Sequence, residues 1–518
     1  MKTKLLLLLL VFVSSLSFGQ IQDLATLSNG KMAYGSVLYD SDNNVYGYLY
    51  IYQLDINQTD KKMEYVFLDK NLNKVSNATY SEKKYSNDSK LNIGVKSNYY
   101  DCTLMGDYII LNKNYYYYKA VTFGNNAPVT QPLLTTFQLI SLKDDTVSQE
   151  YTYENGQFSV MTTDFNKLKK EYKNNKTKNI IYGFNSNNIK GFFIFDDNID
   201  KRYLSKELKF YNEKMEPLWT YVYNPVATKK DYVKFYFETT KNNTIYLSEV
   251  HFKKGLCVDY KIVALDFLTG KKKYEYVLET PKSKYSHTLI TREVDGQLTI
   301  SGRYCPYSQK DGYLLDNDLG FYKILLDENG KAIQEKYTQW SDFRPYIDVD
   351  KNGRVEKNFR LRPTKTFFFK DGSMSVLTEK YKPSGYNMFV GTTASKSDDY
   401  VLFLMDKDFN AKDVQIINKA KSNADIYNDY LFSQYIKDEN GAVFFFQNYD
   451  KNDETKEKQW FLGINTIIDG KLTQEKIPIS SKKKYAIAPA PAKEGYIMLR
   501  EYNEKDKYNQ IRLEKLNY

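Results

Sequence analysis

The stretch GFYKILLDENGKAIQEKYTQW, from Gly320 to Trp340, indicates the fold of the chain. Its first part, Phe321 to Leu326, is a short apolar run; after the turn residues Asp327 to Gly330, apolar side chains alternate with charged ones. An apolar run between turn signals is typical of a strand buried on both faces, whereas alternation with a period of two indicates one exposed face. The stretch therefore predicts a β-hairpin with an inner and an outer strand.

Similar hairpins recur along the chain, and with this one they number seven. The other six begin at Lys62, Thr135, Glu207, Asp259, Asp399 and Gln459. Most are preceded by two more strand candidates joined by a tight turn, as at Asp295-Gly296. Each repeat therefore predicts four antiparallel strands, and repeated units of four strands are typical of the blades of a β-propeller.

The two ends of the chain predict how the ring closes. Three strand candidates follow the seventh hairpin, and a fourth is missing there. At the other end, Ile21 to Ser28 (IQDLATLS) precedes the first complete unit, whose strands we place at Lys31, Val45, Lys62 and Lys74. We expect this N-terminal strand to complete the last blade, which removes free sheet edges. The predicted fold is all-β: a β-propeller of eight four-stranded blades, or seven in the alternative, because the second and third blades have weak first strands.

In this repeated hairpin the chain resembles secreted bacterial β-propeller proteins, over nearly all of the sequence after residue 20. It carries no Trp-Asp or similar signature of a named propeller family. The resemblance therefore implies an architecture and no functional residues.

Residues 1–20 (MKTKLLLLLLVFVSSLSFGQ) predict export. Lys2 and Lys4 precede a leucine run, and small residues lead to Gly19, which is the pattern of a cleaved signal peptide. We expect a signal peptide of residues 1–19, a single propeller domain over 20–518, and a protein in the periplasm or outside the cell. Gln20 in place of a Cys argues against a lipid anchor. No later stretch has the roughly 18 apolar residues of a transmembrane helix.

The formal net charge is +10, and removal of Lys2 and Lys4 leaves about +8. These charges are scattered among many acidic residues, which is typical of a solvated surface. We therefore expect no nucleic-acid partner, and we expect a monomer. One segment, Thr163 to Ile180, predicts a short surface helix rather than a strand, with a Lys-rich partner-binding or membrane-touching helix as the alternative.

Loop lengths predict where a binding site lies. Turns between the first and second strands and between the third and fourth are tight, whereas the other connections are often long, so one face of the ring carries adaptable loops. The loops 305–320, 341–360 and 382–399 contain aromatic and charged side chains, which suit carbohydrate or peptide ligands. The candidate ligand-binding residues are Tyr307, Asp311, Tyr313, Asp316, Asp318, Arg344, Tyr346, Tyr386 and Phe389. The alternative interpretation is that these side chains pack on one another and hold the loops in place.

The sequence predicts no metal site and no cofactor. Residues 69–73 and 406–410 match the first half of a calcium-binding EF-hand loop, but they lack its Gly and closing Glu and occupy positions of hairpin turns. The two histidines, His251 and His287, have no Cys pair at a zinc spacing. No nucleophile-elbow, phosphate-binding or dinucleotide-binding motif is present.

The three cysteines predict one disulfide. By this strand placement Cys257 and Cys305 lie on adjacent blades at the same face, so they could pair in an oxidising compartment. The alternative is that both are small buried hydrophobic residues. Cys102 would stay unpaired.

Three functional hypotheses follow. The first is a non-enzymatic binding or scaffold protein that recognises a glycan, a peptide or an envelope protein through the long loops. The second is an extracellular polysaccharide hydrolase that uses loop carboxylates, for which Asp311, Asp316 and Asp318 are the candidates. The third is a purely structural envelope component. We expect binding without catalysis.

Overall fold

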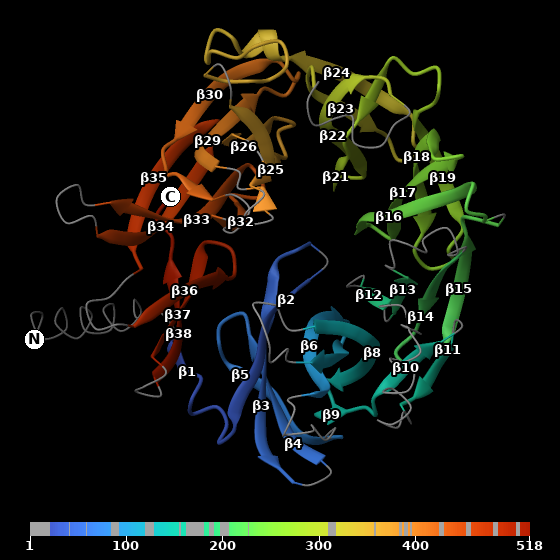
Figure 1. The fold of residues 1–518 in the computed structure, drawn as a ribbon, viewed down its shortest axis with the longest axis vertical. Coiled ribbons are helices and arrows are strands. Elements are labelled where there is room, and N and C mark those ends of the chain that lie inside the picture. The colour runs from blue at the N-terminus through green and yellow to red at the C-terminus, as the bar shows by residue number, and fades with distance from the viewer. Residues whose placement is uncertain are drawn as a thin grey trace, which may run out of the picture.

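The computed structural model describes residues 21–518 except 41, 58–59, 84–92, 120–128, 155–156, 162–180, 186–190, 197–206, 226, 309–317, 357–358, 383–385, 388–391, 394–395, 424–428, 452–456, 480–484 and 504–507. Its antiparallel β-sheets follow one another around a ring, with the first strands of the chain beside the last (Figure 1). This is the all-β propeller that the repeated hairpin predicts.

Seven of these sheets are each formed by one continuous segment, and we number them as blades 1 to 7. Blade 1 contains β2 (Lys31–Tyr39), β3 (Val45–Ile56), β4 (Asp60–Asp69) and β5 (Lys74–Lys83). Blade 2 contains β6 (Ile93–Met105), β7 (Tyr108–Lys119), β8 (Val129–Ser141), β9 (Thr146–Val147), β10 (Tyr151–Glu154) and β11 (Gln157–Val160). Blade 3 contains β12 (Ile181–Asn185), β13 (Phe192–Asp196), β14 (Glu207–Tyr211) and β15 (Pro217–Val222). Blade 4 contains β16 (Asp231–Lys241), β17 (Thr244–Lys253), β18 (Leu256–Asp266) and β19 (Lys272–Glu279).

The remaining three blades lie in the second half of the chain. Blade 5 contains β20 (Tyr285–His287), β21 (Ile290–Val294), β22 (Gln297–Pro306), β23 (Gly320–Leu326) and β24 (Ala332–Gln339), and the short 3-10 helix η3 (Trp340–Phe343) follows it. Blade 6 contains β25 (Arg360–Phe368), β26 (Met374–Lys382), β29 (Lys396–Met405), β30 (Ala411–Ile417) and β31 (Ser422–Asn423). Between β26 and β29, β27 (Tyr386–Asn387) and β28 (Thr392–Thr393) form a separate ribbon. Blade 7 contains β32 (Tyr430–Ile436), β33 (Gly441–Lys451), β34 (Lys458–Ile468) and β35 (Lys471–Pro478).

The ring is closed by a sheet that takes strands from both ends of the chain, which we call the closing sheet. Its order is β1-β38-β37-β36, with β36 (Ala486–Pro491), β37 (Tyr496–Asn503), β38 (Tyr508–Lys515) and β1 (Ile21–Asp23). Ile21 lies opposite Arg512 in the antiparallel pair of β1 and β38. The prediction that the N-terminal strand completes the last sheet is confirmed.

The prediction of eight four-stranded blades is wrong. The alternative count, seven, is the number of blades made from one continuous segment, and the closing sheet is of a different kind because it joins both ends. Blade 2 has six strands, and blades 5 and 6 have five each. The additional strands are short, and β9 and β31 have two residues each. Segments of that length have no periodicity, so the sequence pattern could not reveal them.

The hairpin of blade 5 has the predicted inner and outer strands. β23 is buried at six of its seven positions, whereas half-buried and exposed positions alternate along much of β24. The Oδ1 atom of Asp327 accepts hydrogen bonds from the backbone N–H groups of Asn329 and Lys331, both at 2.9 Å, which fixes the turn. Gly330 has φ +78°, a conformation that L residues with a Cβ rarely adopt.

The core lies between neighbouring sheets. One cluster of buried side chains joins blades 6 and 7 and includes Phe367, Leu402 and Phe444, all at most 1% exposed. A second joins the closing sheet to blade 1 and includes Leu24. Central strands are therefore covered on both faces by the blades beside them, which explains why β3, β29 and β33 read as long apolar runs.

Because the strands within each blade are antiparallel, the two kinds of connection lie on opposite faces of the ring. Tight turns such as 327–331 and 369–373 define what we call the turn face. The connections between β22 and β23, between β26 and β29, and between successive blades define the loop face.

Some sequence expectations lie outside the described part of the chain. These are the signal peptide of residues 1–19 and the helix of Thr163 to Ile180. Among the residues that the structure describes, no helix has the length and apolar character needed to cross a membrane.

Candidate functional site

The nine predicted ligand-binding residues have different outcomes. Asp311, Tyr313, Asp316 and Phe389 lie outside the described residues, and Tyr386 is placed only as part of the backbone of β27. The other four can be located on the loop face: Tyr307, Asp318, Arg344 and Tyr346. Two come from the connection before β23 and two from the connection after η3, so these two predicted loops do belong to one side of blades 5 and 6.

Asp318 is a buried partner of an arginine. It is 4% exposed, and its Oδ2 atom lies 2.6 Å from the Nη1 atom of Arg303 on β22. The backbone carbonyl of Asp318 also accepts a hydrogen bond from the indole Nε1–H of Trp340 at 2.8 Å. The residue therefore orients Arg303 and holds η3 against blade 5, and its carboxylate is already engaged.

The connection between blades 5 and 6 is anchored in the core. Trp340, Phe343, Val349 and Val355 are each at most 2% exposed and pack with Phe403 of blade 6. These apolar residues are spaced along a loop whose other residues are mainly polar. The loop is therefore a fixed part of the structure that can hold its polar side chains in place.

A tight turn presents Arg354 at the end of this loop. The Oδ1 atom of Asp350 accepts hydrogen bonds from the N–H groups of Asn352 and Arg354, both at 2.8 Å. Gly353, with φ +74°, packs so closely on Trp340 that an added Cβ would lie 2.6 Å from the indole ring. Only a glycine fits this turn, which sets the position of the neighbouring Arg354.

A cleft lies where these pieces meet, between blades 5 and 6. Its volume is about 10 Å³, and it is lined by Arg303, Asp318, Asn352, Gly353, Arg354, Arg360 and Leu361. Three guanidinium groups and one carboxylate surround it, so the lining has an excess of positive charge. We call it the arginine cleft.

Within the arginine cleft, the side chain of Arg303 is largely buried. It is 11% exposed, and Nη1 also lies 3.5 Å from the carbonyl oxygen of Leu361. Its buried Nε–H has no hydrogen-bond partner among the described residues. The Nε atom is also closed to solvent.

The other located residues do not line the arginine cleft. Arg344 and Tyr346 are exposed, and Tyr346 shows 44% of its surface. The Nε–H of Arg344 donates to the carbonyl oxygen of Val349 at 3.3 Å. Tyr307 is half-buried. Sequence reasoning missed Arg303, Arg354 and Arg360, although their concentration in one region could have been noticed.

Acidic residues near the cleft are engaged with cations. Glu356 lies 2.8 Å from the ammonium group of Lys380, and Asp399 lies 2.9 Å from it. Burial disfavours the charge on Lys380, but its hydrogen bonds with Glu356 and Asp399 outweigh this effect and raise its pKa. Glu379 forms an ion pair with Arg362.

The two histidines lie elsewhere and form no metal site. His287 is buried, with Nδ1 3.2 Å from Glu279 and Nε2 3.2 Å from the hydroxyl of Tyr337. His251 is 36% exposed on β17, and its Nε2 atom lies 2.6 Å from Asp231, whose pKa this hydrogen bond lowers. In the described part of the chain, no three His, Cys, Asp or Glu side chains are arranged to hold a metal ion.

The two sequences that resemble half of an EF-hand form turns. Asp69 Oδ1 accepts hydrogen bonds from the N–H groups of Asn71 and Asn73 at 2.8 and 2.9 Å, and Asp406 Oδ1 accepts one from Asn410 at 2.8 Å. Their carboxylates thus bind their own backbone, as predicted for hairpin turns.

The predicted disulfide is absent. Cys305 carries a buried free thiol, so its pairing with Cys257 is not made in this structure. Burial, and then the charge of Asp318, raises the pKa of the Cys305 thiol to about 11. Cys305 is enclosed in blade 5 opposite Ser286, so adjacency of blades did not bring the two sulfur atoms together. Cys102 is also a buried free thiol.

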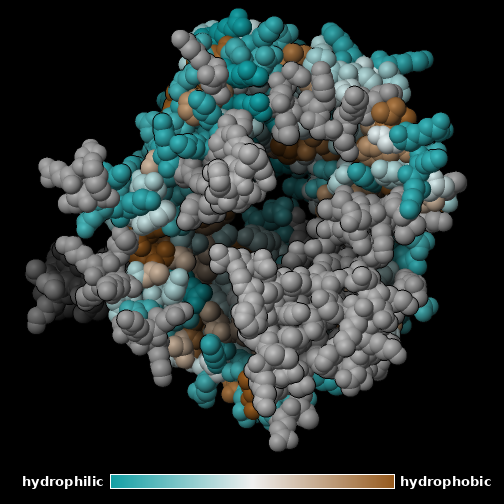
Figure 2. Space-filling view, viewed as in Figure 1, coloured by the Kyte–Doolittle hydropathy of each residue, from teal (hydrophilic) through white to brown (hydrophobic). Residues whose placement is uncertain are grey.

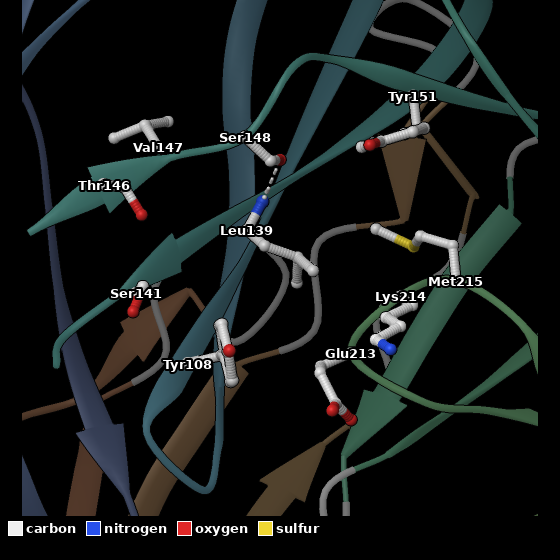
Figure 3. A pocket seen from close by; sticks show the side chains of 10 residues that line it. All are labelled: Tyr108, Leu139, Ser141, Thr146, Val147, Ser148, Tyr151, Glu213, Lys214 and Met215. Carbon is white, nitrogen blue, oxygen red and sulfur yellow. Dashed lines mark hydrogen bonds between the residues drawn. The ribbon is translucent and has the colours of Figure 1, made fainter. Parts of the chain in front are cut away.

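Two larger pockets lie away from the predicted loops. A pocket of about 190 Å³ lies between blades 2 and 3 and is lined by Tyr108, Leu139, Ser141, Thr146, Val147, Ser148, Tyr151, Glu213, Lys214 and Met215 (Figure 3). A pocket of about 290 Å³ on blade 1 is lined by Asp55, Asn57, Asp60, Lys62, Thr79, Tyr80 and Ser81. The ring also has a central hollow with hydrophilic surface inside it (Figure 2).

Solved structures resemble this chain at the level of the fold. The β-propeller domain of the Trilobed protease from Pyrococcus furiosus is 11% identical, with 82% of this chain and 96% of that chain covered and a TM-score of 0.32. An ulvan lyase from a new polysaccharide lyase family is 9% identical, with 82% and 94% covered and a TM-score of 0.36. The quinohemoprotein alcohol dehydrogenase from Comamonas testosteroni is 11% identical, with 95% and 77% covered and a TM-score of 0.35.

No curated protein matches the sequence. A family model does match, over residues 137–517, which include the end of blade 2, blades 3 to 7 and the last three strands of the ring. This chain, which has the β-propeller fold, therefore belongs to DUF6770, a family of unknown function.

Proposed function

We propose that the protein is an exported β-propeller that binds a partner through its loop face, without catalysing a reaction on it. The partner classes are a glycan, a peptide or an envelope protein, as the sequence suggests. The observation that carries the proposal is the arginine cleft, where a core-anchored loop and blades 5 and 6 hold three guanidinium groups around one small opening. Prepositioned polar groups on a rigid scaffold are typical of a binding site.

The absence of catalysis is supported by the engagement of the carboxylate. Glycoside hydrolysis usually needs two carboxyl groups on either side of the scissile bond. Among the described residues that line the arginine cleft, Asp318 is the single acid, and it is ion-paired with Arg303. That pairing suits an orienting role better than proton transfer.

Export is supported by residues 1–19, which have the composition of a signal peptide. We propose that the mature chain begins at Gln20 and acts as a monomer in the periplasm or outside the cell. Fractionation of cells that express the full chain, together with N-terminal sequencing of the mature protein, tests this part.

The function is tested by applying the purified mature chain to arrays of glycans and of peptides, with analysis of the solution for released sugars. Binding without release of reducing ends supports the proposal. Release of reducing ends that survives purification and falls with Asp318→Asn contradicts it and supports the hydrolase. Co-purification with envelope proteins, with no binding to either array, supports the structural role instead.

A further inference from the structure

The pocket between blades 2 and 3 lies at the turn face, on the opposite side of the ring from the arginine cleft. Tyr108 begins β7 after the tight connection 106–107, and Ser141 ends β8. From blade 3, the turn 212–216 between β14 and β15 contributes three residues. Side chains of both blades line a volume of about 190 Å³ (Figure 3). The pocket is therefore separate from the site proposed on the loop face.

The turns 69–73 and 406–410 show what fills the equivalent position elsewhere in the ring. In each turn the fourth residue, Leu72 or Phe409, has a positive φ and donates its N–H to the carbonyl oxygen of the first, as Met215 does. Leu72 is 1% and Phe409 2% exposed, and each packs in the core cluster shared with the preceding sheet. Met215 also packs against blade 2, but a pocket remains beside it. The opening is therefore a departure from the repeat of the blades.

The opening lies where the outer strand of blade 2 is divided. β9 pairs with residues 140–141 of β8, and β10 pairs with residues 136–137. Between them, the Oγ atom of Ser148 accepts a hydrogen bond from the N–H of Leu139 at 2.8 Å, and the N–H of Ser148 donates to the carbonyl oxygen of Leu139 at 2.8 Å. Irregular pairing of this kind redirects side chains and is common beside functional sites.

Five polar side chains of the pocket are free to bind a ligand. Within the described part of the chain, no hydrogen bond or ion pair engages the side chains of Tyr108, Thr146, Tyr151, Glu213 and Lys214. Their hydroxyl and ammonium groups are donors, and the carboxylate is an acceptor. The turn that carries the last two is fixed, because Asn212 Oδ1 accepts hydrogen bonds from the N–H groups of Lys214 and Glu216, both at 2.9 Å. The pocket thus offers donors and an acceptor on a defined backbone.

The charges of the pocket favour an uncharged ligand. Glu213 and Lys214 are neighbours with opposite charges, so each reduces the attraction of the other for an ion. Lys214 is also exposed, and an ion pair at such a position contributes at most about 1 kcal/mol. Hydroxyl groups both donate and accept, so they can use the carboxylate, the ammonium group and the tyrosine hydroxyls together. A ligand with several hydroxyl groups and no charge suits this lining.

The size and the apolar part of the lining limit the ligand further. About 190 Å³ is many times the roughly 10–15 Å³ that one water molecule needs, and less than the roughly 300–1,000 Å³ of sites for drug-sized ligands. Leu139, Val147 and Met215 supply apolar contacts, and the half-buried tyrosines add an apolar ring with a polar tip. A sugar ring has the matching character, with C–H groups on its faces and hydroxyl groups at its edge.

We propose that the pocket between blades 2 and 3 binds a single uncharged sugar unit. Glu213 accepts from its hydroxyl groups, Lys214 and the tyrosine hydroxyls donate to them, and the apolar side chains contact the C–H groups of the ring. This site is additional to the proposed function, which uses the loop face, so either can fail without the other.

The test uses the mature full-length chain and saturation-transfer NMR with the methyl glycosides of glucose, galactose, mannose and N-acetylglucosamine. Methyl glucuronide is the charged sugar probe, and leucine and glutamine are the zwitterionic probes. We expect at least one uncharged glycoside to bind with a dissociation constant on the order of 1 mM, because the contacts are few, and to bind more tightly than the charged and zwitterionic probes.

Variants locate the binding. Thr146→Trp fills the pocket from an exposed position and should weaken binding at least about tenfold. Leu268→Trp is its control, because it places the same ring on the turn of blade 4 at a position 60% exposed.

Glu213→Gln removes a charged acceptor and should weaken binding about tenfold. Its control is Glu328→Gln, at the same position of the equivalent turn 327–331 in blade 5. Both control variants should change affinity less than about twofold. Circular dichroism and melting temperature establish that the variants are folded.

Several outcomes overturn the inference. They are no saturation transfer to any of the four glycosides, tighter binding of leucine, glutamine or methyl glucuronide, and an unchanged affinity in folded Thr146→Trp. If sugar binding persists in Thr146→Trp and is lost in Arg354→Gln, the loop-face function stands and this pocket is not the site. If binding is lost in Thr146→Trp and kept in Arg354→Gln, the pocket is the sugar site whatever the loop face binds.

Discussion

Two seams of the ring are built on different physical principles. The seam between the closing sheet and blade 1 is mainly apolar: Leu24 is fully buried there, and Tyr48 and Tyr52 direct their hydroxyls to backbone carbonyls. The seam between blades 6 and 7 adds an ionic cluster near the loop face. There the completely buried ammonium of Lys419 lies 2.6 Å from Asp429 and 3.1 Å from Glu379.

The difference teaches what each seam contributes. Apolar contacts are nondirectional, so the closing seam can hold the two chain ends together without fixing the direction of each side chain. Buried ion pairs give little net stability, because desolvation opposes their attraction, but they require defined geometry. Glu379 links the ionic cluster to Arg362 on β25, the strand that begins with Arg360 of the arginine cleft. The ion pairs of Glu379 therefore fix the positions of side chains next to the proposed binding site.

The largest effect is expected from breaking the ionic seam. Lys419→Ala should lower the free energy of unfolding by roughly 3–5 kcal/mol, because it leaves Glu379 and Asp429 buried without this cation. Urea denaturation measures the loss. Lys476→Ala is the control, since its pair with Asp450 is exposed and should contribute at most about 1 kcal/mol. A loss below 1 kcal/mol for Lys419→Ala would remove the distinction between the seams.

The apolar seam should respond to loss of volume. Leu24→Ala is expected to destabilise the protein by roughly 2–5 kcal/mol, because Leu24 is fully buried between β1 and blade 1. The same denaturation experiment applies. Ile21→Ala, at a position 57% exposed, should change stability by less than about 0.5 kcal/mol. Equal effects of both substitutions would show that the N-terminal strand is not bound as described.

A smaller effect tests the polar contact within the apolar seam. The hydroxyl of Tyr52 donates a buried hydrogen bond to the carbonyl of Leu24 at 2.9 Å. Tyr52→Phe removes the donor and keeps the ring, so we expect a loss of about 1 kcal/mol. In a double-mutant cycle with Leu24→Ala, the two losses should not be additive, because the residues touch. No loss of stability in Tyr52→Phe would contradict this hydrogen bond.

The smallest effect concerns a carboxylate without a cation. Burial raises the pKa of Glu238, and its one hydrogen bond in the described structure is from Ser248 Oγ at 2.6 Å. A raised pKa means that its favourable contribution is present below the ordinary value of 4.5 and is lost as pH rises through the higher folded value. Glu238→Gln should therefore raise the melting temperature slightly at pH 7 and not at pH 4. The opposite pH trend would contradict the burial of this group.

The sequence predicted the parts of the fold that have a pattern. The alternation in β24 and the apolar run of β23 were sufficient for the hairpin. The missing fourth strand at the C-terminal end identified Ile21 to Ser28 as its partner, and of these residues Ile21–Asp23 form the strand. The number of strands per blade was wrong because β9 and β31 are too short to show alternation. The pairing of Cys257 with Cys305 was wrong because a sequence gives no direction for a side chain within a blade.

The site was predicted in part. Loop length located Asp318, Arg344 and Tyr346 on one face of the ring, and their role in binding stays a prediction. Loop length could not show that Asp318 forms an ion pair with Arg303. Arg303 lies on a strand, and its distance from Asp318 along the sequence fits no recognisable motif. Arg354 and Arg360 were missed because they carry the same charge as the many lysines. Only the rarity of arginine in this chain sets them apart.

The closing sheet has a consequence for how the protein reaches its native state. β1 is made first and β38 last, and Ile21 meets Arg512 across about 490 residues of intervening chain. Contacts between such distant segments form slowly, because a long loop must be ordered before they can be made. The final kinetic step should therefore be the docking of the N-terminal strand. Until synthesis is complete, this strand has no partner in the nascent chain, and a holdase chaperone can bind it.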